Sequence, residues 1–154
     1  MTDGKKPRLV GINHVAIEVS DIDKALEWYA QIFDFALRGK SDRNAFIDMG
    51  DQFVNMTLVR DYTVPGAEKR HIGFVVDDRS RIIELAKAAG ARFVDGPFLD
   101  FLDPWGNRLE IIEYSNIQFT KASHVLRGMG LDLDKNEKAK KELADKGMVD
   151  DAWV

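Results

Sequence analysis

Two segments of the chain show the same change in hydrophobic period. Residues 14–27 (HVAIEVSDIDKALE) and 71–84 (HIGFVVDDRSRIIE) align without a gap, so that His14 pairs with His71 and Asp21 with Asp78. Each copy begins with a β-branched run, passes an acidic helix-start signal and continues with apolar residues at helical spacing. This internal repeat indicates two copies of one supersecondary unit.

The helical part of each copy has one apolar stripe. In the first, apolar residues fall at i, i+3, i+4, i+7 and i+11 from Ile22 to Phe33, and Asp21 is the expected N-cap. In the second, the stripe runs from Ile82 to Ala89, and Gly90 is expected to end the helix in a left-handed conformation. We expect both helices to pack on a sheet.

Short strand candidates follow each helix. They are Phe35–Arg38, Ala45–Met49 and Phe53–Arg60 in the first half, and Arg92–Val94, Phe98–Phe101 and Arg108–Tyr114 in the second. The final hairpins also correspond, because DMGDQFVNMTLV and DPWGNRLEIIEY both place an aspartate and a turn glycine before an apolar strand. The sequence therefore predicts an α+β fold of two βαβββ modules, at about residues 9–60 and 70–115, joined by a linker at Asp61–Arg70.

The residues after Tyr114 have no partner in the repeat. They contain SHVLRGMGL and then DKNEKAKKELADKGM, in which Asp134 and Glu137 have the spacing of a capping box. We expect one domain at 1–115 and a partly helical extension at 116–154. Its mixed-charge helix is typical of a solvated surface, with a dimer contact or a cleft lid as the alternatives.

Composition narrows the class of protein. At 154 residues, with 45% hydrophobic and 31% charged residues, the chain is typical of a globular protein. A net charge of -4 gives no basic field for nucleic acid, and the lack of cysteine leaves only nitrogen and oxygen ligands for a metal. MTDGKKPRLV lacks a signal core and no apolar run reaches about 18 residues. We expect no membrane partner and a cytoplasmic location.

Three possible metal ligands, His14, His71 and Glu110, are expected on the same face of their strands. Because side chains alternate along a strand, His14 and Glu18 lie opposite the helix-covering positions and point into a concave face. The same parity puts His71 and Glu110 on the corresponding face of the second module. Two imidazoles and a carboxylate suit a divalent ion and leave positions open for water or substrate. His124 has no repeat partner and is expected to be a surface or interface residue.

The segments NHVAIEV, RHIGFVV and LDPWGNRLEIIEY resemble the vicinal oxygen chelate superfamily, which includes glyoxalases, and this resemblance covers about residues 9–115. It implies a glyoxalase-like fold in which paired mixed sheets enclose a cleft. A divalent metal there (zinc, iron, nickel or manganese) binds a substrate through adjacent oxygens and stabilises an oxyanion or enolate. The resemblance implies His14, His71 and Glu110 as ligands. The fourth ligand position falls at Asn55, or at Val54 if the turn lacks an extra residue; alternation favours Asn55, as a weak ligand or as a partner of bound water.

Departures from the superfamily patterns bear on the reaction. Glyoxalase I enzymes carry a glutamate at the fourth position, and Asn55 cannot abstract a proton. Extradiol dioxygenases carry a tyrosine where this chain has Asp100, and fosfomycin-modifying members carry a threonine where it has Ala16. We expect an isomerase, epimerase or lyase acting on a small oxygenated metabolite. The alternatives are an extradiol-type dioxygenase and a metal-free binding protein similar to the bleomycin-resistance branch.

Proton transfer beside a carbonyl would need a base near the metal. The candidates are Glu18, Asp48 and Asp100, with Glu110 as both ligand and catalytic group. The parity of Glu113 is opposite to that of Glu110, which predicts a solvent-facing or helix-facing role.

The remaining candidates are expected to have a structural role or to lie either in the core or in a substrate cleft. Asp103 is expected to shape its turn. Five aromatic residues belong either to the core or to a substrate cleft: Phe46, Phe53, Phe101, Trp105 and Tyr114. The resemblance implies a homodimer and leaves open whether the ligands meet within one chain or across a swapped pair.

Overall fold

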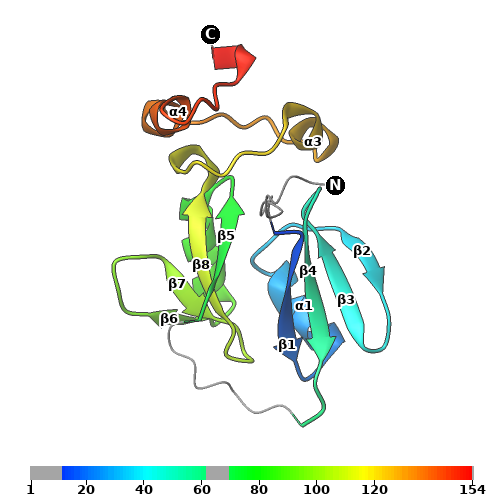
Figure 1. Ribbon diagram of the computed structural model, residues 1–154. Coiled ribbons are helices and arrows are strands. Elements are labelled where there is room, and N and C mark those ends of the chain that lie inside the picture. Colours follow the sequence, from blue (N-terminus) through cyan, green and yellow to red (C-terminus); the bar gives the residue numbers. More distant parts are fainter. Residues whose placement is uncertain (1–11, 62–69, 154) are drawn as a thin grey trace, which may run out of the picture.

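A computed structural model describes residues 12–61 and 70–153 of the chain. The first module contains β1 (His14–Val19), α1 (Ile22–Ala30), β2 (Leu37–Lys40), β3 (Asn44–Asp48) and β4 (Phe53–Leu58), and its sheet has the order β1-β4-β3-β2. The second contains β5 (Ile72–Val76), α2 (Arg79–Ala88), β6 (Arg92–Val94), β7 (Asp100–Leu102) and β8 (Arg108–Glu113), in the order β5-β8-β7-β6. In both sheets the first pair is parallel and the others are antiparallel (Figure 1). The predicted α+β fold of two βαβββ modules is confirmed.

Local sequence signals account for the helix ends. The carboxylates of Asp21 and Asp78 accept hydrogen bonds from backbone N–H groups in the first turns of α1 and α2, as an N-cap does. Gly90 has φ +72° just beyond α2, which is the left-handed conformation expected there.

Two strands begin two residues later than predicted. β2 starts at Leu37, and its pairing with β3 contains a bulge between Leu37 and Gly39. β7 starts at Asp100, and its pairs with both β6 and β8 cover Asp100 to Leu102. Phe98, which was expected in this strand, is 63% exposed in the preceding loop.

The two modules share one hydrophobic core. α1 covers its own sheet and also contacts the second module: Trp28 packs edge-on against Phe101, and Phe33 against Phe74. The Trp28 indole N–H donates to the carbonyl of Ala89, just beyond α2. The helix-covered inner faces of both sheets therefore contribute to a single core, and their other faces are directed outward.

The C-terminal extension forms η1 (Tyr114–Asn116), α3 (Ser123–Gly128), α4 (Glu137–Ala144) and η2 (Asp151–Trp153). It crosses one end of the molecule, with α4 beyond the second sheet and α3 beyond the first (Figure 1). The predicted helix is confirmed, but the predicted capping box is wrong. The N-cap is Asn136, whose side chain accepts from the N–H of Ala139, because Asp134 is instead bonded to Lys140 and Trp153.

Some predicted segments fall outside the description. The N-terminal residues 1–11 and all but the two ends of the predicted linker Asp61–Arg70 lie outside the described residues. Within the described ranges, no helix has the length and apolar character needed to span a membrane.

Candidate metal site

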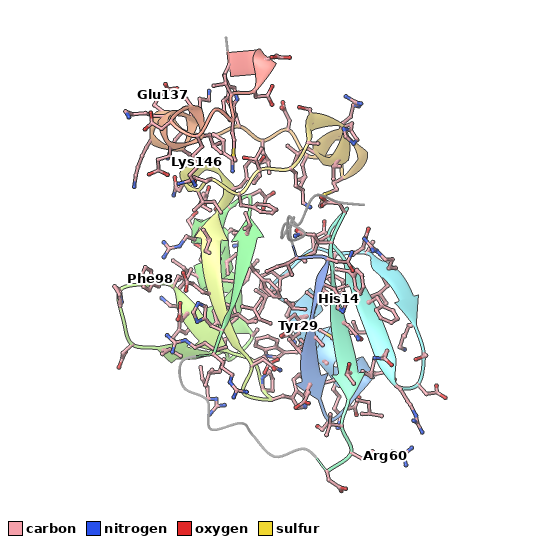
Figure 2. The ribbon with its side chains drawn as sticks, viewed as in Figure 1. His14, Tyr29, Arg60, Phe98, Glu137 and Lys146 are labelled. Carbon is pink, nitrogen blue, oxygen red and sulfur yellow. The ribbon has the colours of Figure 1, made fainter. Side chains whose placement is uncertain are left out.

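His14 lies on the outward face at the start of β1. His14, Ala16 and Glu18 are exposed, whereas Ile17 and Val19 are buried, as strand alternation predicted. Figure 2 labels His14 on the first sheet. Its ring stacks on Phe53, with centroids 4.7 Å apart and an interplanar angle of 12°.

The side chain of Asn13 holds the ring of His14. Its Nδ1 lies 2.9 Å from the side-chain oxygen of Asn13. An amide oxygen only accepts, so this contact is a hydrogen bond in the tautomer with a proton on Nδ1, which is the form that would present the Nε2 lone pair to a metal. Metal-binding histidines commonly have their second nitrogen held in this way.

Asn55 occupies the outer face beside His14. It is the register partner of Ala16, and its side-chain oxygen accepts a hydrogen bond of 2.8 Å from Asn44. Val54 is 1% exposed and belongs to the core. Of the two candidates for a fourth position, only Asn55 therefore shares the face of His14.

The second module brings His71 and Glu110 together. Nε2 of His71 is 3.3 Å from Oε2 of Glu110, and the Glu110 side chain is 19% exposed. Glu110 alternates with the buried Leu109 and Ile111, so it faces outward. An imidazole nitrogen and a carboxylate oxygen at this separation are two donors of a possible metal site.

A buried ion pair adjoins Glu110. Asp100 is its register partner on β7, and Oδ2 of Asp100 accepts from Nε (2.7 Å) and an Nη (2.5 Å) of Arg108. Asp100 is 3% exposed, and its Oδ1 is buried without a hydrogen-bond partner in the described part of the chain. Leaving such an oxygen unpaired costs about 1–3 kcal/mol, and a water, ion or substrate group bound there would remove that cost.

The other candidate bases have different surroundings. Asp48 forms an ion pair of 2.9 Å with Arg38, which also donates to two carbonyls of the following turn. Glu18 is exposed on the face of His14. Glu113 accepts from the backbone N–H of Arg79 at the start of α2, which confirms its helix-facing prediction.

Asp103 shapes its turn, as predicted, and also joins the modules. Its carboxylate accepts from the backbone N–H groups of Trp105 and Asn107 and, at 2.9 Å, from the hydroxyl of Tyr29 on α1. Burial raises the pKa of the Asp103 carboxyl above its ordinary value. The contact between modules had no sequence signal, because it joins residues 74 positions apart.

The candidate cleft aromatics divide into three groups. Phe101 and Trp105 are buried in the core, and Tyr114 is buried where the extension packs on the second module. Phe46 and Phe53 pack edge-on beside His14. Only this last pair borders a predicted ligand.

Within one chain the two histidines lie at opposite ends of the strands. Asn107 and Trp105, which precede β8, donate to Glu18 and Ser20 at the end of β1. β5 is parallel to β8, so His71 lies at this same end. His14 is at the other end of the six-residue β1, roughly 15–20 Å away at about 3.3 Å per residue.

The arrows in Figure 1 agree, because β1 and β4 run opposite to β5 and β8. Over residues 12–61 and 70–153, no three His, Asp or Glu side chains form a group that could hold a metal. One chain therefore brings His71 and Glu110 together but leaves His14 and Asn55 apart from them. His124 lies exposed on α3, as expected for a surface residue.

The family follows from comparison with known proteins. The model of the Glyoxalase/Bleomycin resistance protein/Dioxygenase superfamily matches residues 11–111, and the chain belongs to this superfamily. The vicinal oxygen chelate resemblance is thereby confirmed.

Two curated relatives are enzymes. A probable chloroplastic lactoylglutathione lyase of Arabidopsis thaliana is 30% identical over 121 residues, covering 65% of this chain and 35% of that protein. This chain thus spans about a third of that relative. The glutathione transferase FosA of Serratia marcescens is 26% identical over 113 residues, covering 67% of this chain and 80% of FosA.

A solved structure has the same fold. It is a mutant of the fosfomycin resistance protein FosX of Listeria monocytogenes, complexed with Mn(II) and 1S,2S-dihydroxypropylphosphonic acid. The TM-score is 0.58 and the identity 17%, over 68% of this chain and 90% of that one. At this identity the likeness shows the fold alone.

Proposed function

We propose that this protein is a divalent-metal-dependent enzyme, an isomerase, epimerase or lyase, that acts on a small oxygenated molecule. The observation that carries the proposal is the outward-facing pair of His71 and Glu110, 3.3 Å apart, together with His14 at the matched position on the exposed face of the first sheet. Imidazole nitrogens and a carboxylate oxygen fit zinc, iron, nickel or manganese. The donor set therefore suits the metal that the superfamily implies.

We further propose that the site is completed between two protomers. His14 lies at the far end of its sheet from His71, so one chain supplies two half-sites on outward faces. In a symmetric dimer, His14 and Asn55 of one protomer would meet His71 and Glu110 of its partner, and two such sites would form. Asn55 would then be a fourth oxygen donor or would hold a bound water.

The chain's own groups suggest how a proton could be moved. A bound metal would polarise a substrate carbonyl or paired oxygens and stabilise the anion formed. Asp100 is the favoured base, because its Oδ1 has no described partner while Arg108 holds Oδ2. Glu18 is exposed on the His14 face but is four residues along β1, about 13 Å away, so it is less suited than Asp100. Asp48 is less suited because Arg38 already engages it.

The named relatives support small-molecule chemistry. One is named for lactoylglutathione and another as a glutathione transferase, and the FosX structure holds Mn(II) with a small dihydroxylated phosphonate. We would therefore assay methylglyoxal with glutathione, and fosfomycin with glutathione or water. Asn55 and Ala16 depart from the patterns of these two enzyme classes, so neither reaction is assigned.

Metal analysis tests the proposal directly. The purified protein is compared with His14→Ala, His71→Ala and His124→Ala after reconstitution with Mn²⁺, Zn²⁺, Ni²⁺ or Fe²⁺. We expect wild type and the control His124→Ala to bind metal, and the other two to lose it.

Other outcomes would favour the rival functions. Selective retention of iron, with oxygen uptake in the presence of catechols, would favour a dioxygenase. No metal in the wild type would contradict the proposal and favour a binding protein similar to the bleomycin-resistance branch.

A further inference from the structure

The C-terminal extension is anchored on the second module by a buried lysine. Lys135 is 4% exposed, and its ammonium donates to the carbonyl oxygens of Tyr114 (2.6 Å) and Phe119. It also lies 3.4 Å from the centroid of the Tyr114 ring. A buried ammonium held by two carbonyls and an aromatic face is a specific attachment. We call residues 118–136, which lead up to and include this anchor, the strap.

The strap reaches the first module at the turn between β3 and β4. The ammonium of Lys121 pairs with the carboxylate of Asp51 and lowers the pKa of that group. Val125 and Met129 pack directly on Gly50, where an added methyl group would lie 3.1 Å from a Val125 carbon and 2.7 Å from the Met129 sulfur. The positive φ of +88° at Gly50 also favours glycine at this position.

The turn between β3 and β4 also contacts the residues next to His14. The amide of Gln52 donates to the carbonyl of Ile12 at 2.8 Å, and the backbone N–H of Phe53 donates to the carbonyl of Asn13 at 3.2 Å. Phe53 then stacks on the His14 ring, and the Asn13 side chain bonds its Nδ1. A continuous set of contacts thus joins the strap to both groups that orient the imidazole.

We infer that the strap is a positioning element for His14, acting through Lys121, Asp51 and the turn at residues 49–53. The strap lies beyond the superfamily match, which ends at residue 111. The inference rests on the proposed role of His14 as a metal ligand. Groups that orient a metal-binding histidine typically change affinity 10- to 100-fold when lost. For a contact one step further away we expect a change of about 3- to 10-fold.

The test uses the full chain and Mn²⁺ as the probe. Lys121→Met and Asp51→Asn each remove the ion pair between the strap and the turn. Lys141→Met is the matched control, because Lys141 pairs with Asp145 on the surface of α4. The measurements are the Mn²⁺ dissociation constant and, without metal, the imidazole NMR signals of the three histidines.

We expect Lys121→Met and Asp51→Asn to weaken Mn²⁺ binding to a similar extent and to shift the His14 signals, while His71 and His124 signals stay in place. The double variant should lose no more than either single one, because both remove the same contact. Lys141→Met should leave affinity and signals unchanged.

The inference fails if both single variants bind Mn²⁺ as the wild type does and keep its His14 signals, even if their melting temperatures fall. A loss of affinity with unmoved His14 signals would also contradict it. If His14→Ala binds Mn²⁺ as tightly as the wild type, the proposed metal site itself is wrong. The two failures are therefore distinguishable.

Discussion

A site shared between protomers predicts that two defective variants restore each other. His14→Ala lacks the ligand of the first sheet, and His71→Ala lacks one of the second. In a dimer of one variant with the other, one shared site would lose both histidines. The other shared site would combine an intact His14 with the intact His71 and Glu110 of the partner. Each mixed dimer should therefore contain one complete metal site.

The expected amount of bound metal follows from the symmetry of the dimer. Because a symmetric dimer has two equivalent sites, the purified mixed dimer should bind about half the metal of wild type. Random exchange of equal amounts of the two variants makes about half of all dimers mixed, so the unfractionated mixture should bind about a quarter. If both histidines of a site came from the same chain, every site in the mixture would lack one, and metal would not return.

The assay uses two affinity tags. The variants are refolded together, and dimers carrying both tags are isolated and measured for zinc or manganese by elemental analysis. Each variant refolded alone is the control and should contain little metal. A mixed dimer that is present but as empty as the two controls would refute the shared site.

Three further predictions concern stability. Tyr29→Phe removes the hydroxyl that donates to Asp103 across the modules, so unfolding in urea should show a loss of about 1–3 kcal/mol; an unchanged midpoint would contradict this bond's contribution. Arg108→Met leaves the buried Asp100 carboxylate without its cation and should cost about 3–5 kcal/mol, whereas adding Asp100→Asn should recover part of the loss; no recovery would argue against the pair. Burial lowers the pKa of Lys135 from 10.5 to about 8, so between pH 8 and 10.5 this side chain is more protonated in the unfolded chain than in the folded one. The wild type should therefore gain stability relative to Lys135→Met as the pH rises from 8 to 10.5. A constant difference in stability between the two proteins would contradict the lowered pKa.

The sequence predicted what depends on local patterns. The gapless alignment of His14 with His71 gave the two modules, and strand alternation placed His14, Asn55 and Glu110 on the strand faces opposite the core. The aspartate N-caps followed from local hydrogen-bonding preference. These features depend on residues a few positions apart, so they can be inferred from one chain.

Features that depend on contacts between distant residues could not be predicted from the sequence. The burial of Asp100 requires the register of β7 on β8, which brings it opposite Glu110 and within reach of Arg108. The capping prediction at Asp134 was wrong because its carboxylate is bonded to Lys140 and to Trp153, 19 positions away, and Asn136 is the N-cap instead. Neither contact has a short-range signature.

The internal repeat explains why the two matched histidines, His14 and His71, lie apart in one chain. The parallel pair β1 and β4 runs opposite to β5 and β8 (Figure 1), so equivalent positions fall at opposite ends of the molecule. His14 and His71 are equivalent positions at the starts of the two modules, so the opposed strand directions place them at opposite ends. In a two-fold symmetric dimer, the first module of one protomer can lie beside the second module of its partner. The symmetry then repeats this contact at the other end of the dimer. If His14 and His71 are metal ligands as proposed, a dimer of this kind would complete both sites.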